Sequence, residues 1–348
     1  MAAAPLRVGI LNDMADGPPG TTDIEHWLRL AVDDLVGRGR IDRDVEFVRG
    51  WGLGLPAGTA AAVERAFAAL VEQDVLMVVG PAIGDNALVV TPLADHFRMP
   101  TINWAGTEEA RSDYMFHLQV GSHEDESIVI ARHLAALGKP RIGVVHDRSP
   151  IGRRHLAFLQ AEAEILGLDV AAVAGLSPLA DRAEAEVGRL LDARIEAIVY
   201  LGLGLATPAV ARALAARGWD GSCIMNTAGI RGLEPDYARA IDRWVYVDMF
   251  SDHNQTLAAL RRQHDLPPVA SLKAAKGHDL GRLLAEGLAR APERTREGVL
   301  SGLEQTKWLP AAEGHEGTLL GFGRHDRGAL HGRYLVLRQW IDGTSVEL

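Results

Sequence analysis

The chain has 348 residues and a mass of 37.5 kDa, a length that exceeds one compact core and fits about two domains. It carries 36 Lys and Arg against 46 Asp and Glu, and a net charge of −10 without a basic stripe disfavours nucleic-acid binding. The single cysteine, Cys223, excludes an internal disulfide and a cysteine-rich metal site, and no apolar run approaches the roughly 18 residues that span a bilayer.

The N-terminal part of the chain alternates between short apolar strands and amphipathic helices. Strands are expected at Leu6–Leu11, Val45–Val48, Val75–Val79 and Pro100–Trp104. Helices are expected from an N-cap at Thr22 or Asp23 to Val36, at Thr59–Gln73 and at Asn86–Phe97. Strands this apolar between helices predict a parallel sheet that is covered on both faces.

The same alternation restarts near Gly121. Strands are expected at Arg141–Val145, Asp169–Val173, Ala197–Leu201, Ser222–Met225 and Trp244–Met249. Helices are expected at Asp125–Leu137, Arg153–Leu166, Asp181–Asp192, Ala209–Arg217, Gln255–His264 and His278–Ala291. In the tail, glycine-punctuated apolar runs predict short strands or a hairpin at Thr318–Phe322, Tyr334–Trp340 and Ser345–Leu348. The sequence therefore predicts an α/β protein of two similar halves.

The glycine-rich loops do not match a nucleotide-binding motif. Gly50, Gly52 and Gly54 lie between a strand and a helix, but the onward spacing and Pro56 break the G-x-G-x-x-G pattern. The loop after Leu201 lacks the third glycine, and no P-loop sequence occurs. We interpret both loops as flexible strand–helix connections, with a nucleotide site as the alternative.

The histidines and the cysteine carry no catalytic or metal-binding motif. Neither H-E-x-x-H nor G-x-S-x-G occurs. His123 lies in a charged helix start, His146 ends a strand and His278 opens a helix, so each is interpreted as structural or cleft-lining. Cys223 lies beside Ile224 in a strand that we expect to be buried, where a thiol is inert. We predict no catalytic residue, metal or cofactor, and an enzyme remains an alternative.

Four strings in order resemble the type I periplasmic binding-protein fold. They are Val78–Pro81, Met99–Thr107, Arg141–Asp147 with Ile151–Arg153, and Gly277–Asp279. Within that fold the chain is similar to the branched-chain amino-acid and amide-binding branch, which serves ABC importers.

The resemblance implies two Rossmann-like lobes, each a parallel sheet flanked by helices, with a ligand cleft between them. Lobe one is expected to hold residues 1–120 and about 251–325, and lobe two about 121–250 and 326–348. The three crossovers are expected near Gly121, Phe250 and His325. The implied partners are a small-molecule ligand and an ABC permease, with no nucleic acid and no direct membrane insertion.

In such proteins the ligand contacts loops at the carboxyl ends of the strands. On lobe one, this predicts ligand contacts from Asp13, Trp51, Ala82, Ile83, Gly84, Asp85, Trp104, Ala105, Gly106 and Thr107. On lobe two, it predicts contacts from Asp147, Arg148, Ile151, Gly204, Asn226, Thr227, Ala228 and Met249.

The chain departs from the pattern of amino-acid binders. A hydroxyl and Thr107 are expected to hold the ligand carboxylate, but the hydroxyl position aligns with Gly84. The acidic residue for the ammonium aligns with Asn226 or Thr227, and a buried ammonium without a carboxylate is disfavoured. The aromatic position aligns with Ile151. We therefore expect a small, largely apolar or aromatic ligand rather than a standard amino acid.

A carboxylic acid belongs to the expected ligand class, with Arg148, Arg231 or Lys273 as its partner if one of them faces the ligand. The alternative function is a cytoplasmic small-molecule sensor with the same fold. No export signal precedes the first strand as the sequence is written, which favours the cytoplasm, whereas a removed signal would place the protein outside it.

Overall fold

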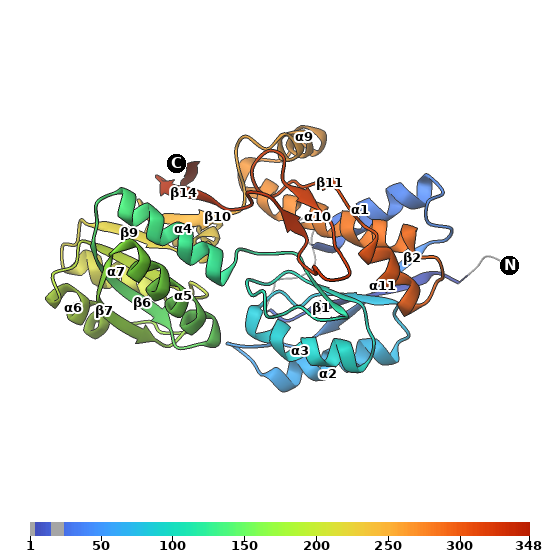
Figure 1. Cartoon of the computed structure of the whole chain (residues 1–348), viewed down its shortest axis with the longest axis horizontal. Coiled ribbons are helices and arrows are strands. Elements are labelled where there is room, and N and C mark those ends of the chain that lie inside the picture. Colours follow the sequence, from blue (N-terminus) through green and yellow to red (C-terminus); the bar gives the residue numbers. More distant parts are fainter. Residues whose placement is uncertain (1–3, 15–23) are drawn as a thin grey trace. The chain divides into compact units, whose positions relative to one another are not determined.

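The computed structural model describes residues 4–14 and 24–348, which form two compact α/β units (Figure 1). The first unit holds the residues up to Val120 and Phe250–Tyr334. The second unit holds Gly121–Met249 and Leu335–Leu348. The chain therefore crosses between the units three times.

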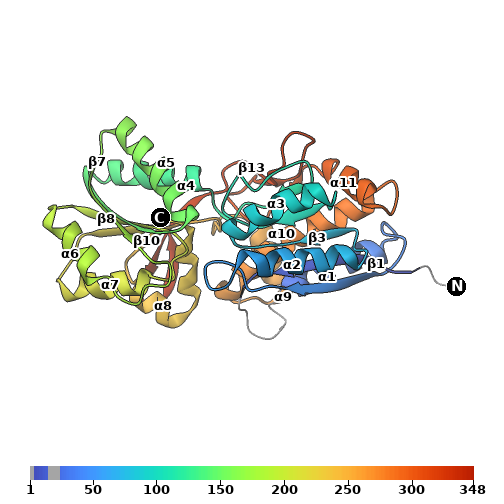
Figure 2. The ribbon, with the colours of Figure 1, turned by 90° about the horizontal axis from the view of Figure 1, so that it is seen from below.

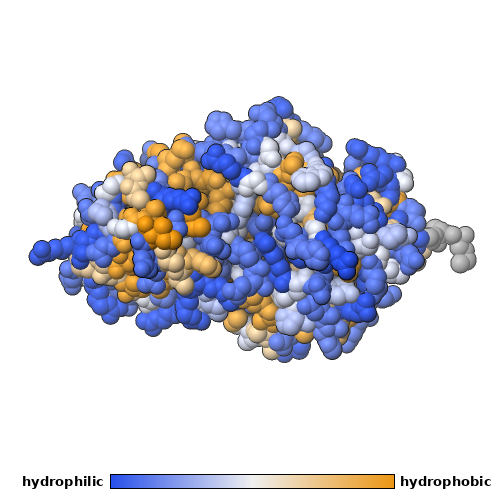
Figure 3. All heavy atoms as spheres, in the orientation of Figure 1, coloured by the Kyte–Doolittle hydropathy of each residue, from blue (hydrophilic) through white to orange (hydrophobic). Residues whose placement is uncertain are grey.

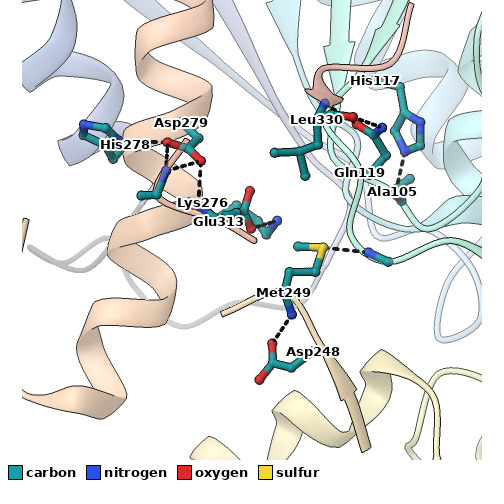
Figure 4. Close-up of polar contacts among 12 residues, drawn as sticks. Ala105, His117, Gln119, Asp248, Met249, Lys276, His278, Asp279, Glu313 and Leu330 are labelled. Carbon is teal, nitrogen blue, oxygen red and sulfur yellow. Dashed lines mark hydrogen bonds and ion pairs between the residues drawn. The ribbon is translucent and has the colours of Figure 1, made fainter. Parts of the chain in front are cut away.

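The third crossing follows Tyr334, whereas the sequence placed it near His325. Residues beyond His325 stay with the first unit because the Gln119 side chain accepts hydrogen bonds from the backbone of Ala329 and Leu330, each 3.0 Å (Figure 4). The Gln119 amide also donates to the Leu330 carbonyl at 3.3 Å. These long-range bonds set a boundary that local composition does not reveal.

The sheet of the first unit has five parallel strands in the order β2-β1-β3-β4-β5. They are β1 (Leu6–Asn12), β2 (Val45–Trp51), β3 (Met77–Val79), β4 (Thr101–Asn103) and β5 (Met115–His117). The helices of this unit are α1 (Ile24–Gly37), α2 (Ala60–Glu72), α3 (Gly84–His96), α9 (Gln255–His264), α10 (Pro268–Arg290) and α11 (Arg296–Glu304). A small antiparallel sheet joins β11 (Leu309–Pro310), β12 (Leu319–Leu320) and β13 (Leu330–His331).

Both faces of the first sheet are covered. Val8 of β1 lies in a core with residues of α1, α10 and α11, whereas Leu11 lies in a core with residues of α2 and α3. Burial on both faces explains why these strands read as continuous apolar runs. The predicted doubly covered parallel sheet is confirmed.

The second sheet has seven strands in the order β15-β14-β10-β9-β8-β6-β7. The parallel strands are β6 (Arg141–Asp147), β7 (Asp169–Leu176), β8 (Ala197–Leu201), β9 (Ser222–Met225) and β10 (Val245–Asp248), and the antiparallel ones are β14 (Val336–Ile341) and β15 (Thr344–Glu347). The helices α4 (His123–Ala136) and α5 (Pro150–Leu166) cover one face (Figure 2). The other face is covered by α6 (Glu184–Asp192), α7 (Thr207–Ala216) and α8 (Pro235–Ala240).

The expected hairpin of the tail forms between β14 and β15. Its turn residues Asp342 and Gly343 have φ of +50° and +77°, the left-handed conformation that a two-residue turn needs. Among helices of residues 4–14 and 24–348, none combines the length and apolarity that a membrane span requires.

The prediction that His278 opens a helix is wrong, because α10 begins at Pro268. Gly277 precedes the helix start that the sequence predicts, but it lies inside α10. A Cβ at this position would come 2.7 Å from Trp27 of α1. The glycine therefore allows two helices to approach closely. The elements β5, α8 and α11 and the 3₁₀ helix η1 (Thr227–Leu233) were not expected. With three and six residues, β5 and α8 are too short to show a period. The N-cap expected at Thr22 or Asp23 lies outside the described residues.

The string Gly277–Asp279 has a structural role within the first unit. The buried Asp279 carboxylate accepts hydrogen bonds from the backbone of Ala312 and Glu313, at 2.9 and 3.1 Å (Figure 4). Lys276, one turn earlier, lies 2.5 Å from the buried Glu313 carboxylate. These contacts fix α10 to the loop that precedes β12.

Candidate functional site

The residues predicted for lobe one collect at one edge of the first sheet. Asp13 follows β1, Trp51 ends β2, Ala82–Asp85 follow β3 and Trp104–Thr107 follow β4. The carboxyl ends of parallel strands meet at one edge, which is where ligands of α/β proteins bind. We call residues 12–14, 51–59, 80–85, 104–112 and 118–120 the first edge.

Asp13 is buried at the first edge, between β1 and β3. Its carboxylate accepts hydrogen bonds from the backbone N–H of Ala82 at 2.9 Å and of Ile83 at 3.0 Å. It also accepts a 2.7 Å bond from the Asn86 amide. Burial raises the pKa of Asp13, while these donors act in the opposite direction. Asp13 thus holds the β3–α3 loop through these backbone N–H groups. The same N–H groups could otherwise bind an anionic ligand.

The N-terminus of α3 carries a second carboxylate. Asp85 lies in the first turn of α3 and is buried, and Gly84 before it is buried as well. A helix N-terminus favours negative charge, and here both Asp13 and Asp85 already provide it. A ligand carboxylate at this end of α3 would meet two carboxylates of the protein.

Apolar groups complete the first edge. Trp51 is 64% exposed, and its indole N–H donates to the Met14 carbonyl at 3.1 Å. Trp104 and Ile83 are half-buried, and Trp104 packs against the core of the first unit. Gly106 is half-buried as well.

The β4 loop is held from beneath by His117, which the sequence did not single out. The His117 Nε2 donates to the Ala105 carbonyl at 2.6 Å (Figure 4). Arg111 Nε donates to the His117 Nδ1 at 3.0 Å. Ala105 is therefore buried beside the core. The hydroxyl of Thr107 is also buried and, among the described residues, has no hydrogen-bond partner.

The residues predicted for lobe two collect at the carboxyl ends of β6, β8, β9 and β10. We call residues 147–153, 176–183, 202–206, 226–231 and 248–249 the second edge. Arg148 is exposed here, whereas Ile151 and Met249 are buried. The Met249 sulfur accepts a 2.9 Å bond from the Gly121 N–H (Figure 4). Two apolar residues that the sequence did not single out, Leu179 and Leu205, are exposed at this edge.

Asp147 holds a loop of the second unit, as Asp13 holds a loop of the first unit. It is 0% exposed, and its carboxylate accepts 2.6 Å bonds from the Tyr200 hydroxyl and from the Leu203 N–H. Burial raises the pKa of Asp147. Gly202 has φ of +153°, and a Cβ there would lie 2.2 Å from the Asp147 carboxylate. In each unit, a buried aspartate after the first strand therefore fixes the loop of the neighbouring strand.

The β8–α7 loop lies against η1. Arg231 Nε donates to the Leu203 carbonyl at 2.6 Å, and the Tyr237 hydroxyl donates to the Gly204 carbonyl at 2.8 Å. Gly204 is buried with φ of +80°, and a Cβ there would come 2.9 Å from Ala228. The sequence suggests Arg231 as one of three carboxylate partners but does not place it at the site. Its position beside this loop depends on the fold.

The two residues at the expected ammonium-binding position are engaged within the second unit. Asn226 is buried and bonds to Gly202 through both its amide nitrogen and its oxygen, at 3.0 and 3.4 Å. The N–H and hydroxyl of Thr227 donate to the buried Glu126 carboxylate at 2.6 and 3.2 Å. Glu126 also accepts from the Ser122 N–H at 2.8 Å. Neither predicted residue offers a negative charge.

A buried histidine pair lies next to Asn226. The rings of His123 and His155 are 4.5 Å apart, and His155 Nε2 accepts from the Asn226 amide at 3.2 Å. Burial and, secondarily, the charge of Arg154 lower the pKa of His123 to about 3. Burial also lowers the pKa of His155 well below its ordinary value. Both imidazoles are therefore neutral near pH 7.

Two cavities lie away from the predicted residues. One, of about 430 Å³, lies among α1, α9 and α10 in the first unit. The other, of about 540 Å³, lies at the opposite edge of the second sheet and is lined by Leu137, Trp219 and Trp244. On the face that Figure 3 draws, apolar side chains gather over the part of this unit that carries α4 and β9. Neither cavity contains a residue of the predicted site.

Metal-ligating side chains do not converge: across residues 4–14 and 24–348, no three His, Cys, Asp or Glu residues group so that they could hold a metal ion. Cys223 is half-buried on β9, and burial raises the pKa of its thiol to about 12. Such a thiol is a poor nucleophile near neutral pH.

Solved structures share this fold over nearly their whole length. A type 1 periplasmic binding protein from Bordetella pertussis has a TM-score of 0.82 and 16% identity, covering 99% of this chain and 100% of that one. A leucine binding protein from Thermotoga maritima has a TM-score of 0.80 and 14% identity, covering 99% and 97%. A solute binding protein from R. palustris in complex with 4-hydroxybenzoate has a TM-score of 0.78 and 15% identity, covering 99% and 96%.

Among curated proteins, none matches the chain. The family model described as "Periplasmic binding protein" matches residues 5–338. That match covers both units, and it confirms the resemblance found in the sequence. The chain therefore belongs to the periplasmic binding protein family.

Proposed function

We propose that the chain is the substrate-binding component of an ABC importer. In this proposal the ligand-binding residues come from the loops of the first edge and of the second edge, at the carboxyl ends of the strands. The ligand is a small, largely apolar or aromatic organic molecule, a class that includes carboxylic acids. The role is binding rather than catalysis, and the protein partner is a membrane permease.

The family supports the general role, because its members bind ligands. Proteins with this fold accept chemically different ligands, since one is a leucine binding protein and another holds 4-hydroxybenzoate. The fold alone therefore leaves the ligand class to the residues of the two edges.

The observation that carries the ligand class is the chemistry at the expected ammonium position. Asn226 and Thr227 are uncharged and hydrogen-bonded within the second unit, and Glu126 beneath them is buried and accepts three bonds. An α-ammonium group placed there would lose its hydration beside a carboxylate whose oxygens already accept from Ser122 and Thr227. Trp51 and Trp104 instead offer apolar surface to a ligand without that group.

The proposal is tested by titrating the purified protein with aromatic and aliphatic acids and amides, and with leucine and valine. A ligand at about 100 times its Kd stabilises the folded state by about 2.7 kcal/mol, which raises the melting temperature measurably. We expect such a rise with apolar or aromatic compounds and none with the two amino acids. A rise with leucine or valine alone would contradict the proposed ligand class.

Replacing Trp104 by alanine is expected to weaken binding of the ligand found in that titration by about 30-fold, because about 2 kcal/mol of aromatic contact is lost. Isothermal titration calorimetry measures the change. The matched control is Trp308→Ala, since Trp308 is 71% exposed and lies outside both edges. Equal affinity of the Trp104→Ala variant and the unaltered protein would place the ligand elsewhere.

A further inference from the structure

Arg231 presents a fixed guanidinium group at the second edge. Its Nε donates to the Leu203 carbonyl at 2.6 Å, and its aliphatic part lies beside Gly204. Within the part of the chain that the structure describes, its two terminal nitrogens have no acceptor, since the Nε bond is the one hydrogen bond of this side chain. An arginine held by Nε keeps two parallel N–H donors free, and that arrangement matches a carboxylate.

The nearest carboxylate of the protein does not occupy those donors. Asp147 attracts Arg231 electrostatically, but it is 0% exposed, and its two oxygens accept from Tyr200 and Leu203. Asp147 therefore attracts the charge of Arg231 without a hydrogen bond to it, and among the described residues no acceptor lies within hydrogen-bond distance of the terminal N–H groups. A half-buried arginine in this state gains most from an acceptor that arrives with a ligand.

The first edge differs from the second edge in its charged residues. The sequence has no Lys or Arg in residues 12–28, 51–59, 80–85 or 118–120, and residues 104–112 contain Arg111 alone. Arg111 donates to His117 beneath the β4 loop. Asp13 and Asp85 lie at the N-terminus of α3. A carboxylate on this edge would therefore meet the negative charge of Asp13 and Asp85, and Arg111 is the one cation that these segments contribute.

We propose that the ligand is an apolar monocarboxylate without an α-ammonium group, and that Arg231 binds its carboxylate. The inference rests on the proposed function, and it narrows the ligand class of the same site. A carboxylate bound by the second unit is the reverse of the arrangement implied by the resemblance to amino-acid binders, in which lobe one holds the carboxylate.

The test compares three head groups on one body. Benzoate, benzamide and benzylammonium share a ring, and 4-methylpentanoate, 4-methylpentanamide and 3-methylbutylammonium share a branched chain. Calorimetric titration at pH 7.5 is expected to give the carboxylate of each set at least about tenfold tighter binding than its amide or ammonium analogue.

The variant Arg231→Gln is expected to lose about 30-fold or more in carboxylate affinity and to change amide affinity by less than about threefold. The matched control is Arg194→Gln, which removes the same charge from an exposed residue before β8, at the opposite edge of the same sheet. Thermal unfolding of each variant without ligand reports a purely structural role. If Arg231→Gln does not fold, Arg231→Lys is used, and it is expected to retain part of the carboxylate preference.

The outcomes separate this inference from the proposed function. Tighter binding of the amide or ammonium compounds by the unaltered protein overturns the inference and leaves the proposed function in place. The inference is also overturned, with the proposed function left in place, if folded Arg231→Gln keeps its carboxylate affinity. The same holds if Arg231→Lys loses none of the carboxylate preference. If none of the six compounds binds, both the inference and the proposed function are contradicted.

Discussion

Replacing Asp13 by alanine is expected to lower the free energy of unfolding of the first unit by about 3–5 kcal/mol. The substitution leaves the N–H groups of Ala82 and Ile83 and the amide of Asn86 without their common acceptor, in a place that is closed to water. Urea-induced unfolding followed by tryptophan fluorescence measures the loss.

The matched control for this variant is Asp34→Ala. Asp34 pairs with Arg38 at 2.8 Å on the exposed face of α1, so its removal is expected to change the stability by less than about 0.5 kcal/mol. A change below about 1 kcal/mol in Asp13→Ala would show that water or a neighbouring group replaces the carboxylate. The role of Asp13 as the clamp of the β3–α3 loop would then be wrong.

Lowering the pH from 7.5 to 5 is expected to destabilise the second unit by about 2 kcal/mol through His123, and the buried His155 acts in the same direction. In the folded protein the pKa of His123 is about 3, so its ring stays neutral at pH 5, and burial lowers the pKa of His155 as well. In the unfolded chain they titrate near pH 6.5 and bind protons. Their contribution is complete above pH 6.5 and is lost as the pH falls from there toward 3.

The measurement is the melting temperature as a function of pH for the unaltered protein and for the variants His123→Gln and His155→Gln. Each variant is expected to flatten the pH dependence, whatever its effect on stability at pH 7.5. His325→Gln serves as the control, because His325 is exposed. The raised pKa values of Asp13 and Asp147 act with the opposite sign, since folding favours their protonated forms. An unchanged pH slope in both histidine variants would contradict the assignment.

Much of the fold was predictable because strands buried on both faces have a simple composition. All five residues of β8 are buried and four of them are aliphatic, and its bounds were predicted without error. Serine and threonine caps also mark helix starts in the sequence, as Thr59 and Ser122 show by accepting bonds from Ala62 and Asp125. Prediction failed for α10, where Gly277 serves a contact with Trp27 that lies far away in the sequence.

The sequence predicted the position of the candidate site better than it predicted the chemistry of its side chains. The carboxyl ends of the strands identified the loops, because that relation follows from the topology. Whether a side chain in such a loop is exposed or hydrogen-bonded depends on partners that are distant in sequence. Asp13 bonds to residues 69, 70 and 73 positions away, and Asp147 to residues 53 and 56 positions away.

By itself, the sequence determined the alternation of strands and helices, the parallel strands of both sheets, the family and the loops of the two edges. Local periodicity, capping residues and a few strings in a fixed order are enough for these, because each is a property of neighbouring residues. The tertiary structure alone decided that Asp13 and Asp147 are buried clamps, that His123 and His155 are paired and neutral, and that Arg231 is held through its Nε at the second edge. Burial and long-range hydrogen bonds set the charge and availability of these groups, and neither is written in the local sequence.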